Sequence, residues 1–315
     1  MSTYSTDFQN YRELINDRLS KVYTEGPNLL LDPINHILNG GKRIRPILCL
    51  LVNKSLNGNK KVALDCSISV ELLHIFSLIH DDIMDGDNLR HSIETIHSKW
   101  NISVAVLAGD AVLGLAFKGL NNVSNNIKEL FNSALIAVCE GQALDIEYES
   151  CKTITLDNYI KMIDLKTGHM ISLCMQLGAM TSSSDDVTIS TMKSIGNDIG
   201  RAFQIQDDLL EVISTSSIMG KNVESDILLN KKTFLTIDAS QKIPEKIEIV
   251  KNKHKDDYKS MIIDYKSLLT IEGIVDNASL YINNLLKNAE HKLNNLKLYD
   301  NCLYEFINYI KDRKC

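Results

Sequence analysis

The run LLHIFSLIHDDIMD, residues 72–85, places two adjacent aspartates inside an otherwise apolar stretch of the chain. Apolar residues recur three and four positions apart from 68 to 80, which is the spacing of one helix face. Carboxylates are rarely found in such surroundings unless they are paired or bind a metal ion. Because residues four apart share a helix face, we expect Asp81 and Asp85 to point together into one cavity.

A second acidic pair lies in the same kind of setting further along the chain. FQIQDDLLE, residues 203–211, carries Asp207 and Asp208 between apolar residues, with Glu211 four positions after Asp207. Two helices that face each other with such clusters could hold hard divalent cations through carboxylate oxygens. Neither cluster has the Glu-x-x-His spacing of a di-iron site, so Mg²⁺ shared with a diphosphate is the better fit. The alternative interpretation is two helix ends whose acids face solvent.

Two further Asp-Asp pairs have simpler interpretations. Asp185-Asp186 follows a serine run and suits the start of a helix. Asp256-Asp257 lies among lysines and is typical of a solvated face. We therefore expect neither pair to belong to a metal site.

Proline, the strongest helix breaker, occurs only four times, and none falls between Pro46 and Pro244. Helical spacing of apolar residues continues through four later segments, 102–120, 127–147, 159–178 and 190–213. No convincing run of alternating strand residues, internal repeat or linker appears. The sequence therefore predicts an all-α fold: a single large antiparallel helical bundle, residues 1–315 as one domain, around a deep central cavity.

The overall composition argues against several classes of protein. The 315-residue chain is 44% hydrophobic and 23% charged with a net charge of -6, which gives no electrostatic case for nucleic acid as a partner. Its seven cysteines are scattered and never paired as Cys-x-x-Cys, so neither a disulfide framework nor a zinc site is indicated. The longest apolar run, Ile47 to Val52, is too short to cross a bilayer, and the amino terminus is unlike a signal peptide. We expect a cytoplasmic protein with no transmembrane segment.

A diphosphate bridged by metal ions also needs cationic side chains. The run GGKRIRP, residues 40–46, concentrates three of them between two glycines and a proline, although a solvated charge run has the same appearance. Further basic candidates are Arg90, His91, His97, Lys166, Lys221 and Lys232. Each of these lysines, taken alone, is more often a surface residue than a site residue.

Together these segments resemble the trans-prenyl diphosphate synthase family, and most of all its archaeal-type geranylgeranyl diphosphate synthases. The matching segments follow the family's order over most of the chain: GGKRIRP at 40–46, HDDIMD at 80–85, Arg90, AVLAGDAVL at 105–113, EGQALD at 140–145, Lys166-Thr167, FQIQDDLLE at 203–211, Gly220-Lys221 and Lys232-Thr233. The resemblance implies the isoprenoid synthase fold, a homodimer, and Mg²⁺ as cofactor, with three ions once substrate is bound. It also implies a prenyltransferase that condenses isopentenyl diphosphate with an allylic diphosphate by 1′-4 coupling, giving a longer all-trans prenyl diphosphate.

The resemblance carries roles to particular residues. The metal ligands would be Asp81, Asp85, Asp207, Asp208 and Glu211, with Asp82 in support. The substrate contacts would be Arg90, His91, Lys166, Lys221 and Lys232, together with Lys42, Arg45 and His74 for isopentenyl diphosphate. Thr167 and Gln204 would line the reacting carbons and steady the cation. The catalytic group would be Asp81, Asp82, Asp85, Lys166, Thr167, Gln204, Asp207 and Asp208.

Two positions depart from the family pattern. His91 stands where the family usually has a second arginine, which makes it a weaker and pH-dependent anion contact. Glu211 replaces the more usual aspartate and is one methylene longer, which leaves its direct coordination of a metal open.

The residues just before the first aspartate pair bear on product length. On a helical wheel Ser77 lies about 40° from Asp81 and one turn below it, whereas Phe76 lies about 140° away. A single aromatic residue five positions before the first aspartate, followed by a small residue, resembles the archaeal-type geranylgeranyl synthases. We therefore expect a twenty-carbon product, with farnesyl or longer polyprenyl products as alternatives.

A terpene cyclase and a non-catalytic prenyl-binding subunit of the same fold are alternatives of another class. A cyclase would normally lack the basic run at 40–46, and its second metal motif usually mixes Asn, Ser and Glu. A non-catalytic subunit would be expected to lack acids in one cluster. Neither expectation fits this sequence.

Overall fold

The computed structural model describes residues 6–90, 92–213, 232–254 and 257–312. Its elements are, in chain order, α1 (Thr6–Leu19), α2 (Asn28–Leu38), α3 (Ile44–Ser55), α4 (Lys60–Asp85), β1 (Leu89–Arg90), β2 (Ile93–Glu94), α5 (Ile96–Lys99), α6 (Ile102–Gly119), α7 (Asn125–Ser150), α8 (Leu156–Ile163), the π-helical turn η1 (Asp164–Gly168), α9 (His169–Met180), α10 (Asp186–Ile213), α12 (Phe234–Lys242), α13 (Pro244–Lys253), α14 (Tyr258–Ile271), α15 (Ile274–Leu293) and α16 (Cys302–Lys311). Within these ranges β1 and β2 are the only strands, and they pair antiparallel. The prediction of an all-α fold is confirmed.

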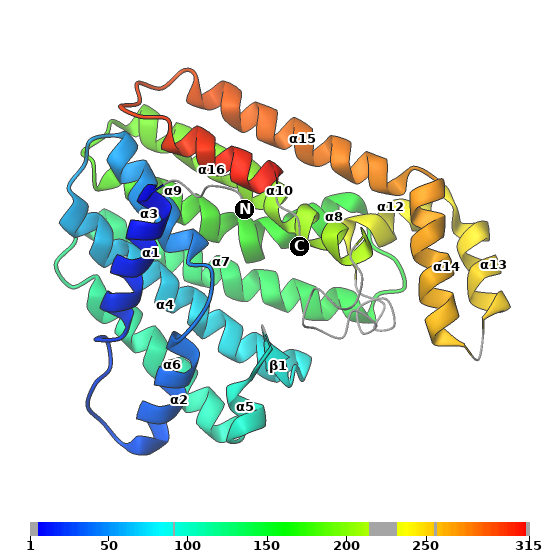
Figure 1. Ribbon diagram of the computed structural model, residues 1–315, viewed down its shortest axis with the longest axis horizontal. Coiled ribbons are helices and arrows are strands. Elements are labelled where there is room, and N and C mark those ends of the chain that lie inside the picture. Colours follow the sequence, from blue (N-terminus) through cyan, green and yellow to red (C-terminus); the bar gives the residue numbers. More distant parts are fainter. Residues whose placement is uncertain (1–5, 91, 214–231, 255–256, 313–315) are drawn as a thin grey trace.

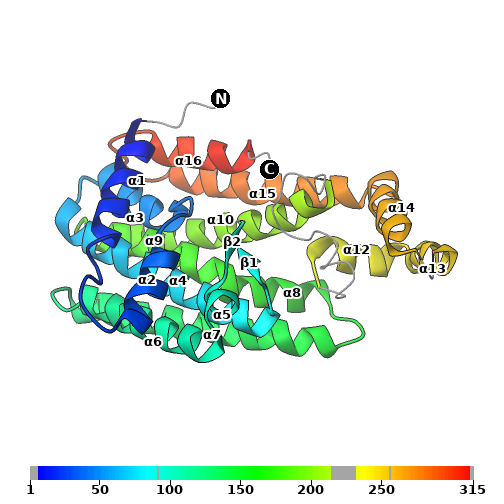
Figure 2. The same ribbon diagram turned by 60° about the horizontal axis from the view of Figure 1, so that its bottom comes forward.

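The long helices lie side by side as an antiparallel bundle with α4 inside it (Figure 1). α4 packs against α3, α6 and α9, while α10 packs against α9 and α15. The core includes the fully buried Leu72, Leu73 and Ile79 of α4. α1 and α2 lie across one end of the bundle, and α12, α13 and α14 form the opposite end (Figure 2). That residues 1–315 make one domain stays a prediction.

Local sequence signals fix where α4 begins and ends. The Asn59 side chain caps the first turn by accepting hydrogen bonds from the N–H groups of Lys61 and Val62. Gly86 ends the helix in the left-handed conformation, with φ 68°, which glycine adopts without strain. α4 therefore ends directly after Asp85, and its acidic residues lie in the last turns.

The described members of the two acidic pairs with simple interpretations lie at helix starts. Asp185 Oδ1 accepts from the Thr188 N–H at 2.8 Å, which caps α10 as predicted and lowers the pKa of that carboxyl. Asp257 is exposed, as predicted, and also accepts from the Ser260 N–H at 3.2 Å at the start of α14. Asp256 lies outside the described residues.

Two helices, α4 and α6, are long and apolar enough to cross a membrane by length and composition alone. The most apolar window of each helix is longer than the uninterrupted apolar run at 47–52, because these windows contain polar residues as well as apolar ones. A buried core helix passes the same test, and α4 is such a helix, with 67% of its most apolar window buried. Only 33% of the window on α6 is buried, so part of this helix presents an apolar surface.

Candidate active site

A cavity of about 440 Å³ opens between the carboxyl-terminal parts of α4 and α10, the loop before α3, and η1. Most of the residues that the sequence analysis singled out line it, although they come from five separate segments of the chain. They are Lys42, Arg45, His74, Ser77, Asp81, Asp85, Arg90, Lys166, Thr167, Gln204 and Asp207. This convergence supports the predicted deep cavity and gives it both acidic and basic walls.

Three carboxylates face the cavity: Asp81 and Asp85 from α4, and Asp207 from α10. Burial is the main cause that raises the pKa of Asp81, and the nearby Asp85 raises it further, while Lys166 opposes both. Neither α4 nor α10 has a basic residue in its last turn. Carboxylates at a helix carboxyl terminus also face the negative end of the helix dipole. The acids are therefore placed where a cation would stabilise them.

These carboxylates fit Mg²⁺ that is shared with a phosphorylated ligand. In the described residues no group of three or more His, Cys, Asp or Glu side chains is arranged to hold a metal ion on its own. Mg²⁺ usually takes only one or two protein carboxylates and completes its shell with water and phosphate oxygens. The two faces formed by Asp81 with Asp85, and by Asp207, match that demand.

The second aspartate of each pair is used by the protein itself. Asp82 is 2% exposed, and its Oδ1 accepts from the Arg90 guanidinium at 2.5 Å. Asp208 is 8% exposed and accepts from the Tyr159 hydroxyl at 2.6 Å, the Phe234 N–H at 3.1 Å and the Gln204 amide at 3.2 Å. Burial raises the pKa of Asp208 to about 6, and these hydrogen bonds oppose the rise. Neither residue lines the cavity, and the metal-binding role of Asp208, with Asp82 in support, stays a prediction.

Lys166 reaches the cavity from the π-helical turn η1. Its Nζ donates to Asp145 Oδ2 at 2.7 Å. Burial alone would lower the pKa of this ammonium group, but Asp145 and Asp81 outweigh that effect and raise it, so Lys166 stays charged. The close approach of α7 to η1 depends on Gly141, where a Cβ would lie 2.5 Å from the Lys166 backbone nitrogen.

Of the three cations in the basic loop before α3, two line the cavity and one is buried in the fold. Gly40 and Gly41 have positive φ angles of 122° and 88°, which lets the loop turn tightly. Arg43 is buried and donates to Glu71 Oε1 at 2.7 Å and to Asn16 Oδ1 at 3.0 Å. It therefore anchors the loop to α4 and α1.

The other two cations of the loop, Lys42 and Arg45, line the cavity. Arg45 also lies 3.0 Å from His74 Nε2. The loop thus presents two basic side chains to a ligand, held in place by the buried third one.

Thr167 and Gln204 connect the cavity to the buried aspartate of α10. The Thr167 hydroxyl donates to Gln204 Oε1 at 2.9 Å, and the Gln204 amide nitrogen donates to Asp208. This chain of hydrogen bonds fixes the orientation of both polar side chains, so their oxygens are held toward the cavity before any ligand arrives.

Gln142 is a cavity residue to which the sequence analysis gave no role. It is 6% exposed, lines the cavity from α7, and neither its Oε1 nor its Nε2 has a hydrogen-bond partner within the described structure. A buried unpaired amide costs about 1–3 kcal/mol, so a ligand in the cavity is its natural partner. The signal in the sequence is the EGQALD run at 140–145, which lies within a segment of helical spacing.

Several predicted site residues lie elsewhere. Ser77 lines the cavity, but Phe76 does not, and its ring packs edge-on against His80 with centroids 4.7 Å apart. Glu211 does not line it either, and its backbone oxygen accepts from Lys266 at 2.7 Å. Lys232 lines a different, smaller cavity beside α12.

Two more of the predicted substrate contacts, His91 and Lys221, lie outside the described residues. The position of each relative to the cavity therefore stays a prediction.

Comparison with known proteins adds an independent line of observation. Residues 27–268 match the family model described as polyprenyl synthetase. The chain is 34% identical over 252 residues to a geranylfarnesyl diphosphate synthase of Natronomonas pharaonis, covering 72% of this chain and 74% of that protein. It is also 34% identical over 247 residues to a geranylgeranyl diphosphate synthase of Sulfolobus acidocaldarius, covering 75% and 74%. The crystal structure of a geranylgeranyl pyrophosphate synthetase from Pyrococcus horikoshii superposes with a TM-score of 0.89 at 30% identity, covering 98% and 97% of the two chains.

Proposed function

The chain belongs to the polyprenyl synthetase family and is a prenyltransferase, and from this premise we propose that it makes geranylgeranyl diphosphate in the cytoplasm. The reaction joins isopentenyl diphosphate to an allylic diphosphate. The observation that carries the proposal is the single cavity in which Asp81, Asp85 and Asp207 face Lys166 and the basic loop. Such a cavity can hold two diphosphates and place their carbons together.

The two acidic faces would hold Mg²⁺ between them. When bound there, Mg²⁺ supplies positive charge that neutralises the leaving diphosphate and favours cleavage of the allylic C–O bond. The family resemblance implies three such ions with substrate bound. Asp81 and Asp85 suit one side of this arrangement because they share a helix face, and Asp207 suits the other side.

Basic side chains would hold the two diphosphates at different walls of the cavity. Lys166 and Arg90 lie beside the acidic faces and suit the allylic diphosphate. Lys42 and Arg45, on the loop anchored by Arg43, suit isopentenyl diphosphate. This division would set the double bond of one substrate against the reacting carbon of the other.

The remaining lining residues suit the control of a carbocation. The oxygens of Thr167 and Gln204 are fixed by their mutual hydrogen bond and can face the developing positive charge. Apolar side chains, among them Leu78, Met170 and Phe203, exclude water from the same space. No side-chain base stands out, so we propose that the departing diphosphate accepts the proton that is lost after coupling.

The product length follows from the side chain below the first aspartate. Ser77 lines the cavity and leaves room for the growing chain, whereas Phe76 is turned toward His80. The named relatives include both geranylgeranyl and geranylfarnesyl synthases, so similar sequences make products of different length.

Mass spectrometry of the products tests both the reaction and its end point. The purified protein is incubated with Mg²⁺, isopentenyl diphosphate and, separately, dimethylallyl, geranyl or farnesyl diphosphate. We expect products that end at twenty carbons. Ser77→Phe should shorten them and Phe76→Ala should leave them unchanged. No consumption of isopentenyl diphosphate with any starter would contradict the proposed reaction.

We also propose that α6 lies at a homodimer interface. Its Ile102, Val106, Leu107 and Phe117 side chains are exposed, and a second copy can cover such an apolar face around a two-fold axis. Light scattering should give twice the 35.4 kDa mass of one chain. The substitution Leu107→Glu should lower the measured mass toward that of the monomer, and a monomeric wild-type protein would contradict this assignment.

A further inference from the structure

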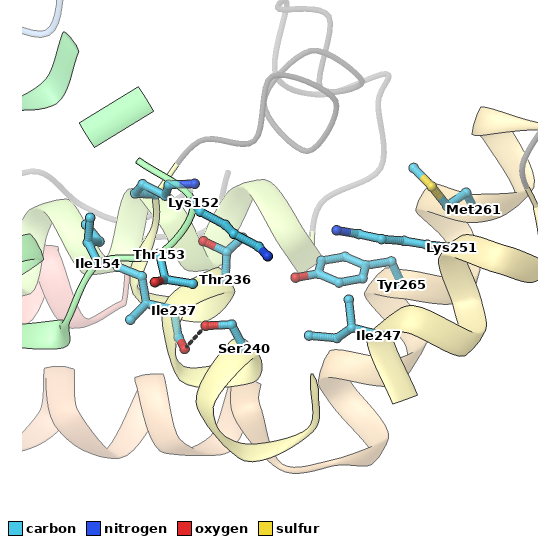
Figure 3. Close-up of a pocket in the computed structure, with 11 residues that line it drawn as sticks. Lys152, Thr153, Ile154, Thr236, Ile237, Ser240, Ile247, Lys251, Met261 and Tyr265 are labelled. Atoms are coloured by element: carbon cyan, nitrogen blue, oxygen red, sulfur yellow. Dashed lines mark hydrogen bonds between the residues drawn. The ribbon is translucent and has the colours of Figure 1, made fainter. Parts of the chain in front are cut away.

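A second cavity, of about 170 Å³, lies away from the active site among the α7–α8 loop, α12, α13 and α14 (Figure 3). Lys152 and Thr153 approach it from the loop, Thr236 from α12, and Lys251 and Tyr265 from α13 and α14. Nothing in the proposed reaction uses this space. Its lining nevertheless has an unusual chemical composition.

Three lysines, Lys152, Lys232 and Lys251, line this cavity, and none of its described lining residues is a carboxylate. None of the three has a hydrogen-bond or ion-pair partner in the part of the chain that the structure describes. The chain as a whole carries a net charge of -6. Ammonium groups gathered in one place repel each other, so an anion in the cavity would stabilise them.

Other lysines at the same end of the molecule form ion pairs with carboxylates. Lys242 lies 2.9 Å from Asp238, Lys246 lies 2.6 Å from Glu272, and Lys253 lies 2.7 Å from Asp264. Carboxylates are therefore at hand in α12, α14 and the turn after it. The three cavity lysines differ because none of the described carboxylates pairs with them.

Tyr265 adds a buried donor to the same cavity. The residue is 7% exposed, and its hydroxyl has no hydrogen-bond partner in the described residues. Figure 3 shows this hydroxyl directed into the cavity beside the end of Lys251. Burial raises the pKa of Tyr265 to about 12, so the group stays protonated and can donate to an anion.

We propose that this cavity binds a diphosphate group at a second site, distinct from the active site. A diphosphate has more charge and more acceptor oxygens than a single phosphate, which suits three ammonium groups and a hydroxyl from opposite walls. Ile154, Ile247 and Met261 line the same space and leave a place for a short apolar tail. The identity of such a ligand rests on the proposed function. It would be either the inorganic diphosphate that the reaction releases or a prenyl diphosphate.

The cavity is next to a segment that supports the active site. Lys232 directly precedes Thr233, which caps α12, and the following Phe234 donates its N–H to Asp208 at 3.1 Å. Asp208 in turn holds Gln204. A ligand in the second cavity therefore lies one short stretch of backbone from the catalytic wall of α10.

Calorimetric titration of the full-length protein in EDTA tests the proposal, with inorganic diphosphate, geranyl diphosphate and inorganic phosphate as probes. The double variant Lys152→Gln/Lys251→Gln removes two charges from the exposed rim. Lys287→Gln/Lys297→Gln removes two charges from exposed positions elsewhere and is the matched control. We expect the first variant to lose at least about tenfold in affinity for diphosphate, and the control to bind as the wild type does.

A further variant, Tyr265→Phe, removes only the hydroxyl and should weaken diphosphate binding several-fold while thermal unfolding stays close to wild type. Binding of geranyl diphosphate that is tighter than that of inorganic diphosphate, and is weakened in Lys152→Gln/Lys251→Gln, would identify a prenyl diphosphate as the ligand. Equal binding would identify the released diphosphate. The proposal is overturned if Lys152→Gln/Lys251→Gln binds diphosphate as wild type does, or if inorganic phosphate binds as tightly as diphosphate.

This test is independent of turnover. A protein that failed to consume isopentenyl diphosphate but kept lysine-dependent diphosphate binding would refute the proposed reaction and retain the second site. An active enzyme whose diphosphate binding did not depend on these lysines would refute only the second site.

Discussion

The aspartate pair on α4 and the one on α10 divide their residues in the same way. Asp81 and Asp207 line the cavity, whereas Asp82 and Asp208 are buried and bound by other protein groups. Consecutive residues on a helix point about 100° apart, so the two members of each pair can have different surroundings. In each Asp-Asp pair, therefore, one carboxylate is available to a ligand in the cavity and the other holds neighbouring protein groups in place.

The largest expected effect is on catalysis by the cavity-facing member. Asp81→Ala removes a carboxylate that would hold Mg²⁺ against the leaving group, so kcat should fall by about a thousandfold or more. Turnover is measured with isopentenyl and geranyl diphosphates at saturating Mg²⁺. Asp186→Ala, from the exposed pair at the start of α10, is the matched control and should keep wild-type turnover. Near-wild-type turnover of Asp81→Ala would break the comparison.

The next largest effect is on the free energy of unfolding, and we expect it for Asp208, the buried member of the pair on α10. Asp208→Ala leaves the Tyr159 hydroxyl and the Phe234 N–H without their acceptor in a buried setting. Unfolding in urea should therefore show a loss of about 3 kcal/mol.

Asp81→Ala should change the unfolding free energy by less than about 1 kcal/mol, because burial already disfavours the charged form of this carboxyl. If Asp81→Ala proved the less stable of the two variants, the roles assigned to the pair members would be reversed.

A smaller effect sharpens the idea that the cavity is built for a ligand rather than for stability. Gln142→Leu replaces an unpaired buried amide by an apolar side chain of similar size. We expect the free protein to gain about 1 kcal/mol of stability and to lose about tenfold in kcat/KM. Thermal unfolding and steady-state kinetics on the same preparation measure both. A variant that is stabilised but fully active would assign Gln142 no part in binding or catalysis.

The fold and the broad outline of the site follow from the sequence because both rest on local patterns. Helical periodicity and the scarcity of proline predict the bundle, and spacing of four predicts that Asp81 and Asp85 share a face. What packs against each face is a tertiary matter, and no local pattern reveals it. The resemblance therefore gave Asp207 and Asp208 the same ligand role, although Asp207 lines the cavity and Asp208 is buried against other protein groups.

Two other differences have the same physical origin. Arg43 belongs to a basic run, but the positive φ of 57° at this residue and the nearby Glu71 turn its side chain into the core. Lys232 follows a segment outside the described residues, and its side chain lines the smaller cavity. In both cases the direction of one side chain depends on the backbone and on neighbours from distant segments.

Mg²⁺-dependent binding of inorganic diphosphate tests the central claim most directly. Wild type, Asp81→Asn and Asp208→Asn are titrated with diphosphate in EDTA and again in Mg²⁺, and the gain in affinity due to the metal is compared. The account predicts that Asp81→Asn loses this gain whereas Asp208→Asn keeps most of it. If Asp81→Asn kept the full Mg²⁺-dependent gain while Asp208→Asn lost it, the assignment of the cavity-facing aspartates as metal ligands would be contradicted.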